Sequence, residues 1–131
     1  MKIKFQKYES GGNDFVLIDD RNNIYNLSPE KIRNICSRNF GVGSDGLILL
    51  KVSSVADIKM CYYNSDGLPS TLCGNGTRCL FSFSLSLGII KKIAKIETSE
   101  GIYTVTISNK NLVSLKMKIL MILFYLTTRH I

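Results

Sequence analysis

A glycine-rich segment, Cys73-Gly74-Asn75-Gly76-Thr77-Arg78-Cys79, places a thiol at the mouth of a tight loop in the middle of this chain. A helix that begins just after Cys73 would direct unpaired backbone N–H groups and the positive end of its dipole at the sulfur. Such a position lowers the pKa of a thiol and also binds an anion such as a carboxylate. Cys73 is therefore a candidate base beside a carboxylate pocket. The alternative is a small core cysteine followed by an ordinary turn.

The residues that follow this segment allow two structures. Residues 81–87 alternate strictly between large apolar side chains and serines, which by itself predicts a half-buried strand. However, the glycine-rich segment is a plausible helix start and Gly88 a plausible C-terminal cap. Small serines between large apolar residues also suit a helix that is buried on all sides. The pattern alone leaves strand and helix open.

On both sides of this region the pattern is that of a strand-rich domain. We expect two short strands, at residues 3–5 and 15–18, joined by a glycine-rich bend at residues 9–13. Ser28-Pro29-Glu30 predicts the start of a helix over about residues 29–39, because it combines an N-cap, a proline and an acid in the first turn. Further strands are expected at residues 47–52, 58–63, 93–98, 102–107 and 112–117, the last three antiparallel. The predicted fold class is α+β.

Length and composition limit the function classes. With 131 residues, 45% of them hydrophobic, the chain suits one globular core. The net charge of +7 would suit a nucleic acid or a membrane surface if it were clustered, but the lysines are scattered and only those at residues 91–95 could form a patch. The longest apolar run, residues 119–126, is far shorter than the roughly 20 residues of a spanning helix. We therefore expect neither a nucleic-acid partner nor a membrane span.

The scarcity of histidine and the cysteine spacing exclude other chemistries. The single histidine, His130, lies next to the last residue, where it is a poor catalytic base. The cysteines at 36, 61, 73 and 79 contain no Cys-x-x-Cys pair, so we expect no metal site. The first seven residues carry charge without an apolar run behind them, which does not fit a secretory signal. These features favour a cytoplasmic protein with reduced thiols.

Four motifs in order resemble the signatures of the diaminopimelate epimerase family. The resemblance covers about residues 1–117 and implies an enzyme that inverts the α-carbon of diaminopimelate, for lysine and cell-wall synthesis, without a cofactor. It also implies one half of a two-domain fold, in which each half is a curved, mostly antiparallel, barrel-like sheet wrapped around a central helix. On this resemblance, residues 81–87 are expected to be helical. The motifs are Gly12-Asn13-Asp14-Phe15, Gly41-Val42-Gly43-Ser44-Asp45-Gly46-Leu47, Tyr63-Asn64-Ser65-Asp66-Gly67 and the segment from Cys73 to Cys79.

The resemblance assigns roles by position. Cys73 matches the first catalytic cysteine, one of two acid/base groups on opposite faces of the α-carbon. Asn13 and Asn64 match substrate-contacting asparagines, and Gly74 with Asn75 match the helix start that holds the α-carboxylate. A carbanion without a cofactor needs a thiolate aimed at the proton and fixed donors on the adjacent carboxylate, which agrees with these assignments. The remaining cysteines, 36, 61 and 79, are expected to pack in the core and not to serve as the second base.

The chain departs from the family in three places. Glu9-Ser10 stands where the family has a lead-in such as His-Gly, and Leu68-Pro69 stands where it commonly has Ser-Glu. After residue 117 the family continues into a second domain that carries the other catalytic cysteine, whereas residues 118–131 form an unrelated apolar tail. We expect a truncated domain that is inactive alone.

Three questions stay open from the sequence. The tail is expected either to cause self-association or to fold back in place of the family's last strand. A separately encoded second half is a further expectation. Alternative functions are a related cofactor-independent amino-acid racemase or isomerase, a non-catalytic fragment, or a basic binding module.

Overall fold

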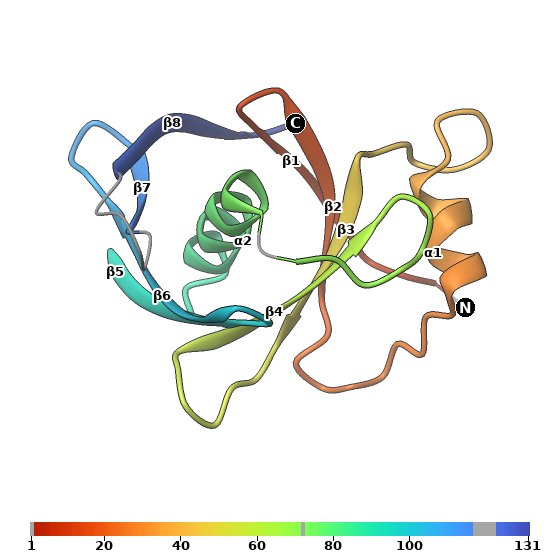
Figure 1. The fold of residues 1–131 in the computed structure, drawn as a ribbon, viewed down its shortest axis with the longest axis horizontal. Helices are drawn as coiled ribbons and strands as arrows, with labels where there is room; N and C mark the ends of the chain where they lie inside the picture. The colour runs from red at the N-terminus through yellow and green to blue at the C-terminus, as the bar shows by residue number, and fades with distance from the viewer. Residues whose placement is uncertain (1, 72, 117–122) are drawn as a thin grey trace.

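Eight strands surround one helix in the computed structural model, which describes residues 2–71, 73–116 and 123–131. Helix α2 (Gly74–Ser86) runs through the middle of the ring, and helix α1 (Pro29–Cys36) lies outside it (Figure 1). The strands follow one another around a closed barrel in chain order. They are β1 (Gln6–Ser10), β2 (Asn13–Asp19), β3 (Gly46–Lys51), β4 (Ile58–Asn64), β5 (Ile93–Thr98), β6 (Gly101–Ile107), β7 (Leu112–Lys116) and β8 (Leu123–His130).

The sheet is mostly antiparallel. Strands β2 and β3 are parallel, as are β4 and β5, and the other neighbouring pairs are antiparallel. Helix α1 connects the first parallel pair and helix α2 the second, because parallel neighbours need a crossover. The expected α+β fold, a curved sheet wrapped around a central helix, is confirmed.

Helix α2 forms the centre of the core. Its side chains are buried on several faces, including those of Cys79, Leu80, Phe81 and Phe83. The alternation of residues 81–87 was misleading because a helix enclosed by a barrel wall has no broad solvent face to produce a 3.6-residue period. At Gly76 the helix approaches the sheet so closely that an added Cβ would lie 3.0 Å from Ile48 Cδ1.

Helix α1 packs on the outer face of the sheet. Ser28 caps its start by accepting the N–H of Lys31 at 3.2 Å, as the sequence predicted. The helix ends at Cys36, three residues earlier than expected, because the chain turns back and the N–H of Gly43 reaches the carbonyl of Ile35 at 3.1 Å. A second cluster of buried side chains lies between helix and sheet: Val16, Ile18, Ile32, Cys36, Leu47 and Leu49.

The first predicted strand was misplaced. Residues 3–5 are not a strand, and β1 instead runs through Glu9 and Ser10, which were assigned to a loop. The reason is that Gly11 and Gly12 alone make the turn, so Ser10 pairs directly with Asn13. The glycine-rich bend is therefore a tight hairpin turn.

The end of the chain contributes a strand to the barrel. Strand β8 pairs with β7, where Leu115 lies opposite Phe124, and with β1, where Ser10 lies opposite Thr128. This corresponds to the fold-back alternative for the tail. Residues 117–122, which include the predicted domain boundary and the start of the apolar run, lie outside the described residues. The division at residue 117 stays a prediction.

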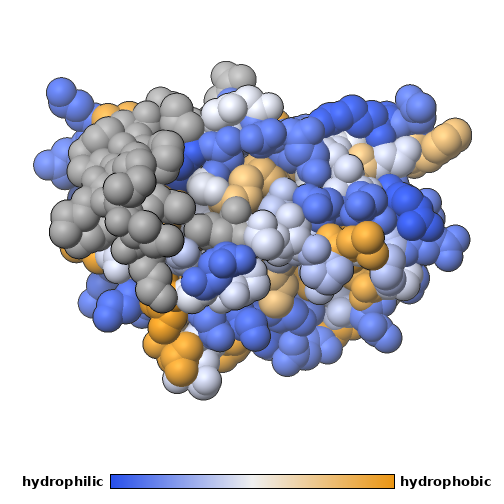
Figure 2. All heavy atoms as spheres, in the orientation of Figure 1, coloured by the Kyte–Doolittle hydropathy of each residue, from blue (hydrophilic) through white to orange (hydrophobic). Residues whose placement is uncertain are grey.

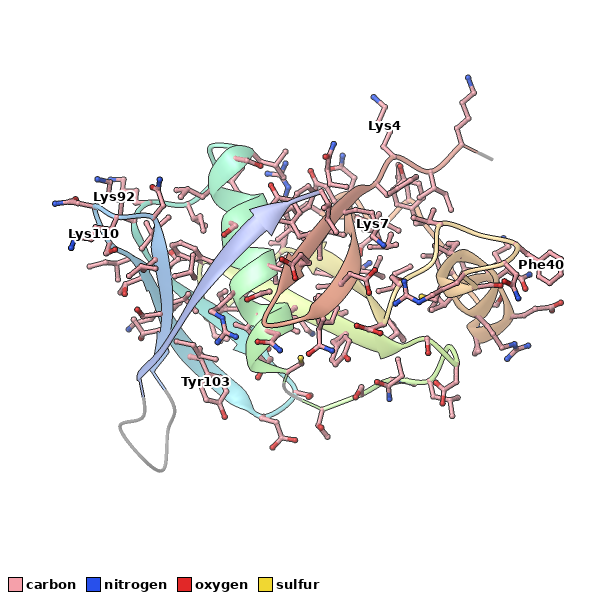
Figure 3. All side chains as sticks on the ribbon, turned by 90° about the horizontal axis from the view of Figure 1, so that it is seen from above. Lys4, Lys7, Phe40, Lys92, Tyr103 and Lys110 are labelled. Atoms are coloured by element: carbon pink, nitrogen blue, oxygen red, sulfur yellow. The ribbon has the colours of Figure 1, made fainter. Side chains whose placement is uncertain are left out.

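Charged and apolar residues are mixed on the surface. In Figure 2, hydrophilic residues cover most of the visible described face, and the apolar ones appear in separate small groups. Phe40, 93% exposed, projects from the α1 end, while Lys92 and Lys110 project at the opposite end (Figure 3). Neither described helix has the length and apolar character needed to cross a membrane.

Candidate active site

Cys73 stands at the start of the central helix, as predicted. Its backbone is extended, with φ −119° and ψ 115°, and its Sγ accepts the N–H of Gly76 at 3.4 Å. Its carbonyl oxygen accepts the N–H of Thr77 at 2.9 Å and the Thr77 hydroxyl at 2.8 Å. The sulfur is thus an N-cap acceptor and lies at the positive end of the helix dipole.

The two N–H groups next to the sulfur remain available for a ligand. Within the described part of the chain, the backbone N–H groups of Gly74 and Asn75 donate no hydrogen bond. Donors of this kind at a helix start bind carboxylates and phosphates. The thiol and an anion-binding position therefore adjoin each other.

Asn75 and Asn13 are brought together although 62 residues separate them. The Nδ2 of Asn75 donates to the Oδ1 of Asn13 at 2.7 Å, and the Nδ2 of Asn13 donates to Asp45 Oδ2 at 3.2 Å. The hairpin turn makes this approach possible because Gly11 has φ +59° and a Cβ there would stand 2.6 Å from Asn75 Oδ1. Two of the predicted site residues are thus in direct contact.

Asn64 lies at the same end of the sheet but apart from this pair. It is exposed at the end of β4 and pairs with Gly46 on β3, which in turn pairs with Phe15 on β2. Asn13 is only two residues before Phe15, so both asparagines lie at the same end of the neighbouring strands β2, β3 and β4. Among the described residues, no hydrogen bond connects Asn64 to Cys73, Asn13 or Asn75.

Charged residues that the sequence analysis left without a role hold the two loops at this edge. Arg38 donates to both carboxylate oxygens of Asp14, at 3.1 and 2.9 Å, and also to Asp45 at 3.2 Å. Lys7, on the barrel side that faces α1 (Figure 3), donates to Asp14 at 2.7 Å. These hydrogen bonds, chiefly that from Arg38, hold the pKa of Asp14 well below its ordinary value. The result is a clamp that fixes Asp45 and, through it, Asn13.

Tyr62 is a further neighbour of the thiol that sequence reasoning missed. It packs with Cys73 against the core, and its ring meets Phe15 edge to face at 5.9 Å. Burial raises the pKa of Tyr62 to about 12, and the negative charges of Cys73 and Asp45 add to this effect. A Cβ on Gly46 would stand 2.7 Å from Tyr62 Cε1, so the glycine of the second motif makes room for this ring.

A half-open cavity of about 340 Å³ lies between β4, the end of β5 and the loop before Cys73. Cys73 is not on its wall, although Thr71, two residues earlier, is. The cavity therefore does not contain the thiol. Its other lining residues are Lys59, Met60, Cys61, Tyr62, Tyr63, Pro69, Ser70, Glu97, Thr98 and Ser99.

The other cysteines have core surroundings, as expected. Cys36 and Cys79 are buried and Cys61 is partly buried. Burial raises the pKa of each of these thiols. None of the three shares the start of a helix with open N–H donors.

Known proteins are similar to this chain in sequence. The chain is 45% identical over 117 residues to the diaminopimelate epimerase of Flavobacterium psychrophilum, which covers 88% of this chain and 46% of that protein. It therefore spans about half the length of this curated relative.

Solved structures share the fold. A phenazine biosynthesis protein of the PhzF family from Bacillus anthracis matches with a TM-score of 0.66 at 24% identity, over 88% of this chain and 40% of that one. A hydroxyproline epimerase from Agrobacterium vitis matches with a TM-score of 0.64 at 16% identity, over 88% and 41%. The family model for diaminopimelate epimerase matches residues 5–119. The chain belongs to the diaminopimelate epimerase family.

Proposed function

We propose that this domain supplies one face of a diaminopimelate epimerase active site, with Cys73 as the acid/base group. The observation that carries the proposal is the placement of the Cys73 sulfur at the start of α2, next to two open N–H donors and the Asn75–Asn13 pair. The family resemblance assigns roles to the same residues. Their roles as catalytic and substrate-binding groups are part of the proposal.

The chemistry needs a base and a place for the charge that develops. As thiolate, Cys73 takes the α-proton from one face, and the electron pair is left on the α-carbon beside the carboxylate. The N–H groups of Gly74 and Asn75 hold that carboxylate and stabilise the developing charge. A second thiol returns a proton to the opposite face and inverts the centre. The resemblance implies that this thiol comes from a second domain, and the scheme requires no cofactor.

The substrate is proposed to be a small amino acid with a second polar end. Asn13 and Asn64 lie at one edge of the sheet, and their side-chain amides can bind the amino and carboxylate groups of diaminopimelate. The proposed setting is lysine biosynthesis in the cytoplasm, with a second half of the enzyme as the protein partner. Self-association of the chain stays an expectation.

A chimera tests the proposal directly. Residues 1–117 of this chain would be joined to the remaining part of the Flavobacterium psychrophilum relative, and conversion of the LL to the meso isomer measured. We expect turnover in the chimera, and a loss of about 100-fold to 10,000-fold on Cys73→Ala. The matched control Cys36→Ala should retain turnover, because Cys36 is buried away from α2 between α1 and the sheet.

The outcome also tests the alternative functions. If the intact relative is active and the chimera folds but is inactive, the proposed role of this domain is contradicted. The hydroxyproline epimerase among the similar structures favours a second candidate, a racemase acting on another amino acid. A chimera that inverts proline or hydroxyproline but not diaminopimelate would support that candidate.

The 131-residue chain alone should not approach a turnover of ~10 s⁻¹, a typical enzyme rate, because a single thiol can exchange a proton on only one face of the α-carbon.

A further inference from the structure

Arg78 is buried in the core, an unusual place for a cation. Its exposed fraction is 1%, and among the side chains whose burial the structure describes it is the largest that is fully buried. Charged side chains are almost never buried to this degree unless an opposite charge accompanies them. The scheme proposed above gives this residue no role.

The guanidinium lies beneath the start of α2. Its Nη1 is 3.6 Å from the point where a Cβ on Gly74 would stand. Its Nε donates to the Ser10 hydroxyl at 3.2 Å, and its Nη2 donates to the Oδ1 of Asn75. Asn75 in turn donates to Asn13, so one continuous set of hydrogen bonds leads from Arg78 to the site.

The charge of Arg78 has no acidic partner in the described part of the chain. The ion pairs found there join other residues: Lys7, Arg38, Asp14 and Asp45 at the clamp, Arg21 with Asp19, and Lys51 with Asp20. Burial lowers the pKa of the Arg78 guanidinium, and the nearby sulfurs of Cys79 and Cys73 oppose that change. A buried cation of this kind attracts an anion from outside the protein.

We propose that Arg78 is a positioning residue that orients the Asn75 amide and places a buried positive charge behind the carboxylate position at the start of α2. The guanidinium is planar and presents its N–H donors at fixed angles, which accounts for the orientation of the Asn75 amide. One nitrogen holds Asn75 by its oxygen, which leaves the Nδ2 of that amide directed at Asn13. The charge adds an attraction that neutral backbone N–H groups cannot supply. The inference rests on the proposed carboxylate position but not on turnover.

Two alkylating reagents of similar size test the charge. Iodoacetate carries a carboxylate and iodoacetamide does not, and both transfer a carbon to a thiolate with loss of iodide. We expect Cys73 of the 131-residue chain to prefer iodoacetate more than free cysteine does. In Arg78→Met the ratio of the two rates should fall about threefold to tenfold. A purely structural effect would change both rates in proportion and leave their ratio unchanged.

Two further variants separate charge from shape. Arg21→Met removes one positive charge at the opposite end of β2, where Arg21 pairs with Asp19, and should leave the ratio unchanged. Arg78→Lys keeps the charge but not the fork. It should keep the preference for iodoacetate while shifting the Asn75 side-chain amide signals in ¹⁵N NMR spectra. The buried Cys79 reports on folding, because it should stay unlabelled in every folded variant.

The results distinguish the inference from the proposed function. If Arg78→Met retains the wild-type ratio, or Arg78→Lys leaves the Asn75 signals in place, the inference is wrong even when the chimera is active. If the ratio falls as expected and the chimera does not turn over, the inference stands and the proposed function fails. If Cys79 becomes labelled in Arg78→Met, that variant is not properly folded and Arg78→Lys is used for the test. Loss of the preference for iodoacetate in Arg78→Lys would then overturn the proposal.

Discussion

At the scale of single residues, the four cysteines differ in surroundings and should differ in reactivity. We expect Cys73 to be alkylated first, because it caps a helix, whereas burial raises the pKa of Cys36, Cys61 and Cys79. Brief iodoacetamide treatment followed by mass-spectrometric mapping measures the order. Labelling of Cys36 or Cys61 ahead of Cys73 would remove the physical basis for its role as a base.

Asp14 makes stability depend on pH in a defined direction. Its pKa is lowered in the folded chain from an ordinary value of 3.8, chiefly by Arg38, so its stabilising effect is complete above about pH 4. Below that pH the unfolded carboxyl takes up a proton first, and the effect is lost as the pH falls toward the folded pKa. Asp14→Asn should cost about 2 kcal/mol near neutral pH and about 1 kcal/mol less near pH 3, where the unfolded carboxyl is mostly protonated but the folded one is still ionised. Urea unfolding at both values checks this; an equal cost at both would contradict it.

Residue-scale prediction from the sequence succeeded where the interactions are local. The N-cap position of Cys73 follows from the few residues after it, and the resemblance supplied Asn13 and Asn75. The roles of Arg78 and Tyr62 could not be predicted in this way. Arg78 contacts Ser10, 68 positions earlier, and Tyr62 on β4 meets Phe15 on β2 over the intervening strand β3. Such contacts depend on register and closure, which spacing along the chain does not reveal.

At the scale of elements, the β1–β2 hairpin turn controls the position of Asn75. Gly11→Ala forces a Cβ to within 2.6 Å of Asn75 Oδ1, whereas a Cβ at Gly12 meets nothing within 4 Å. Both glycines have positive φ, so each alanine costs about 1 to 2 kcal/mol in backbone strain. We expect Gly11→Ala to cost about 1 kcal/mol more than Gly12→Ala, and to slow reaction of Cys73 with iodoacetate. Thermal unfolding of the two variants gives the comparison. Equal costs would show that the Asn75 side chain moves aside without loss of stability.

Most elements were predictable because apolar runs bounded by turns mark strands. The interval 93–98 agrees with β5 at both ends, and the helix start at Ser28-Pro29 is correct. The two errors share a cause. The end of β1 and the end of α1 are decided by backbone partners elsewhere, Asn13 for Ser10 and Gly43 for Ile35, which local preference cannot anticipate.

At the scale of the whole molecule, β8 closes the sheet between β7 and β1. Removing residues 123–131 would expose the edges of both neighbours, and we expect loss of cooperative unfolding in urea together with aggregation. The control is Phe40→Ser, which removes an exposed side chain far from this seam and should leave unfolding cooperative. A truncated chain that remains cooperatively folded and becomes more soluble would show that the tail does not complete the barrel.

The pairing of β1 with β8 gives this domain a high contact order. Ser10 lies opposite Thr128, so closing the ring brings together positions 118 residues apart, and the entropy of that loop opposes early closure. The Ser10 hydroxyl also accepts a hydrogen bond from Arg78 Nε, so β1 contributes to the site. We expect the β1–β8 pairing that holds this strand to be one of the last to form. Pulse-labelling hydrogen exchange during refolding should therefore show the hairpin amides protected before those of the β1–β8 seam. Organisation of the site around Cys73 would coincide with closure of the barrel.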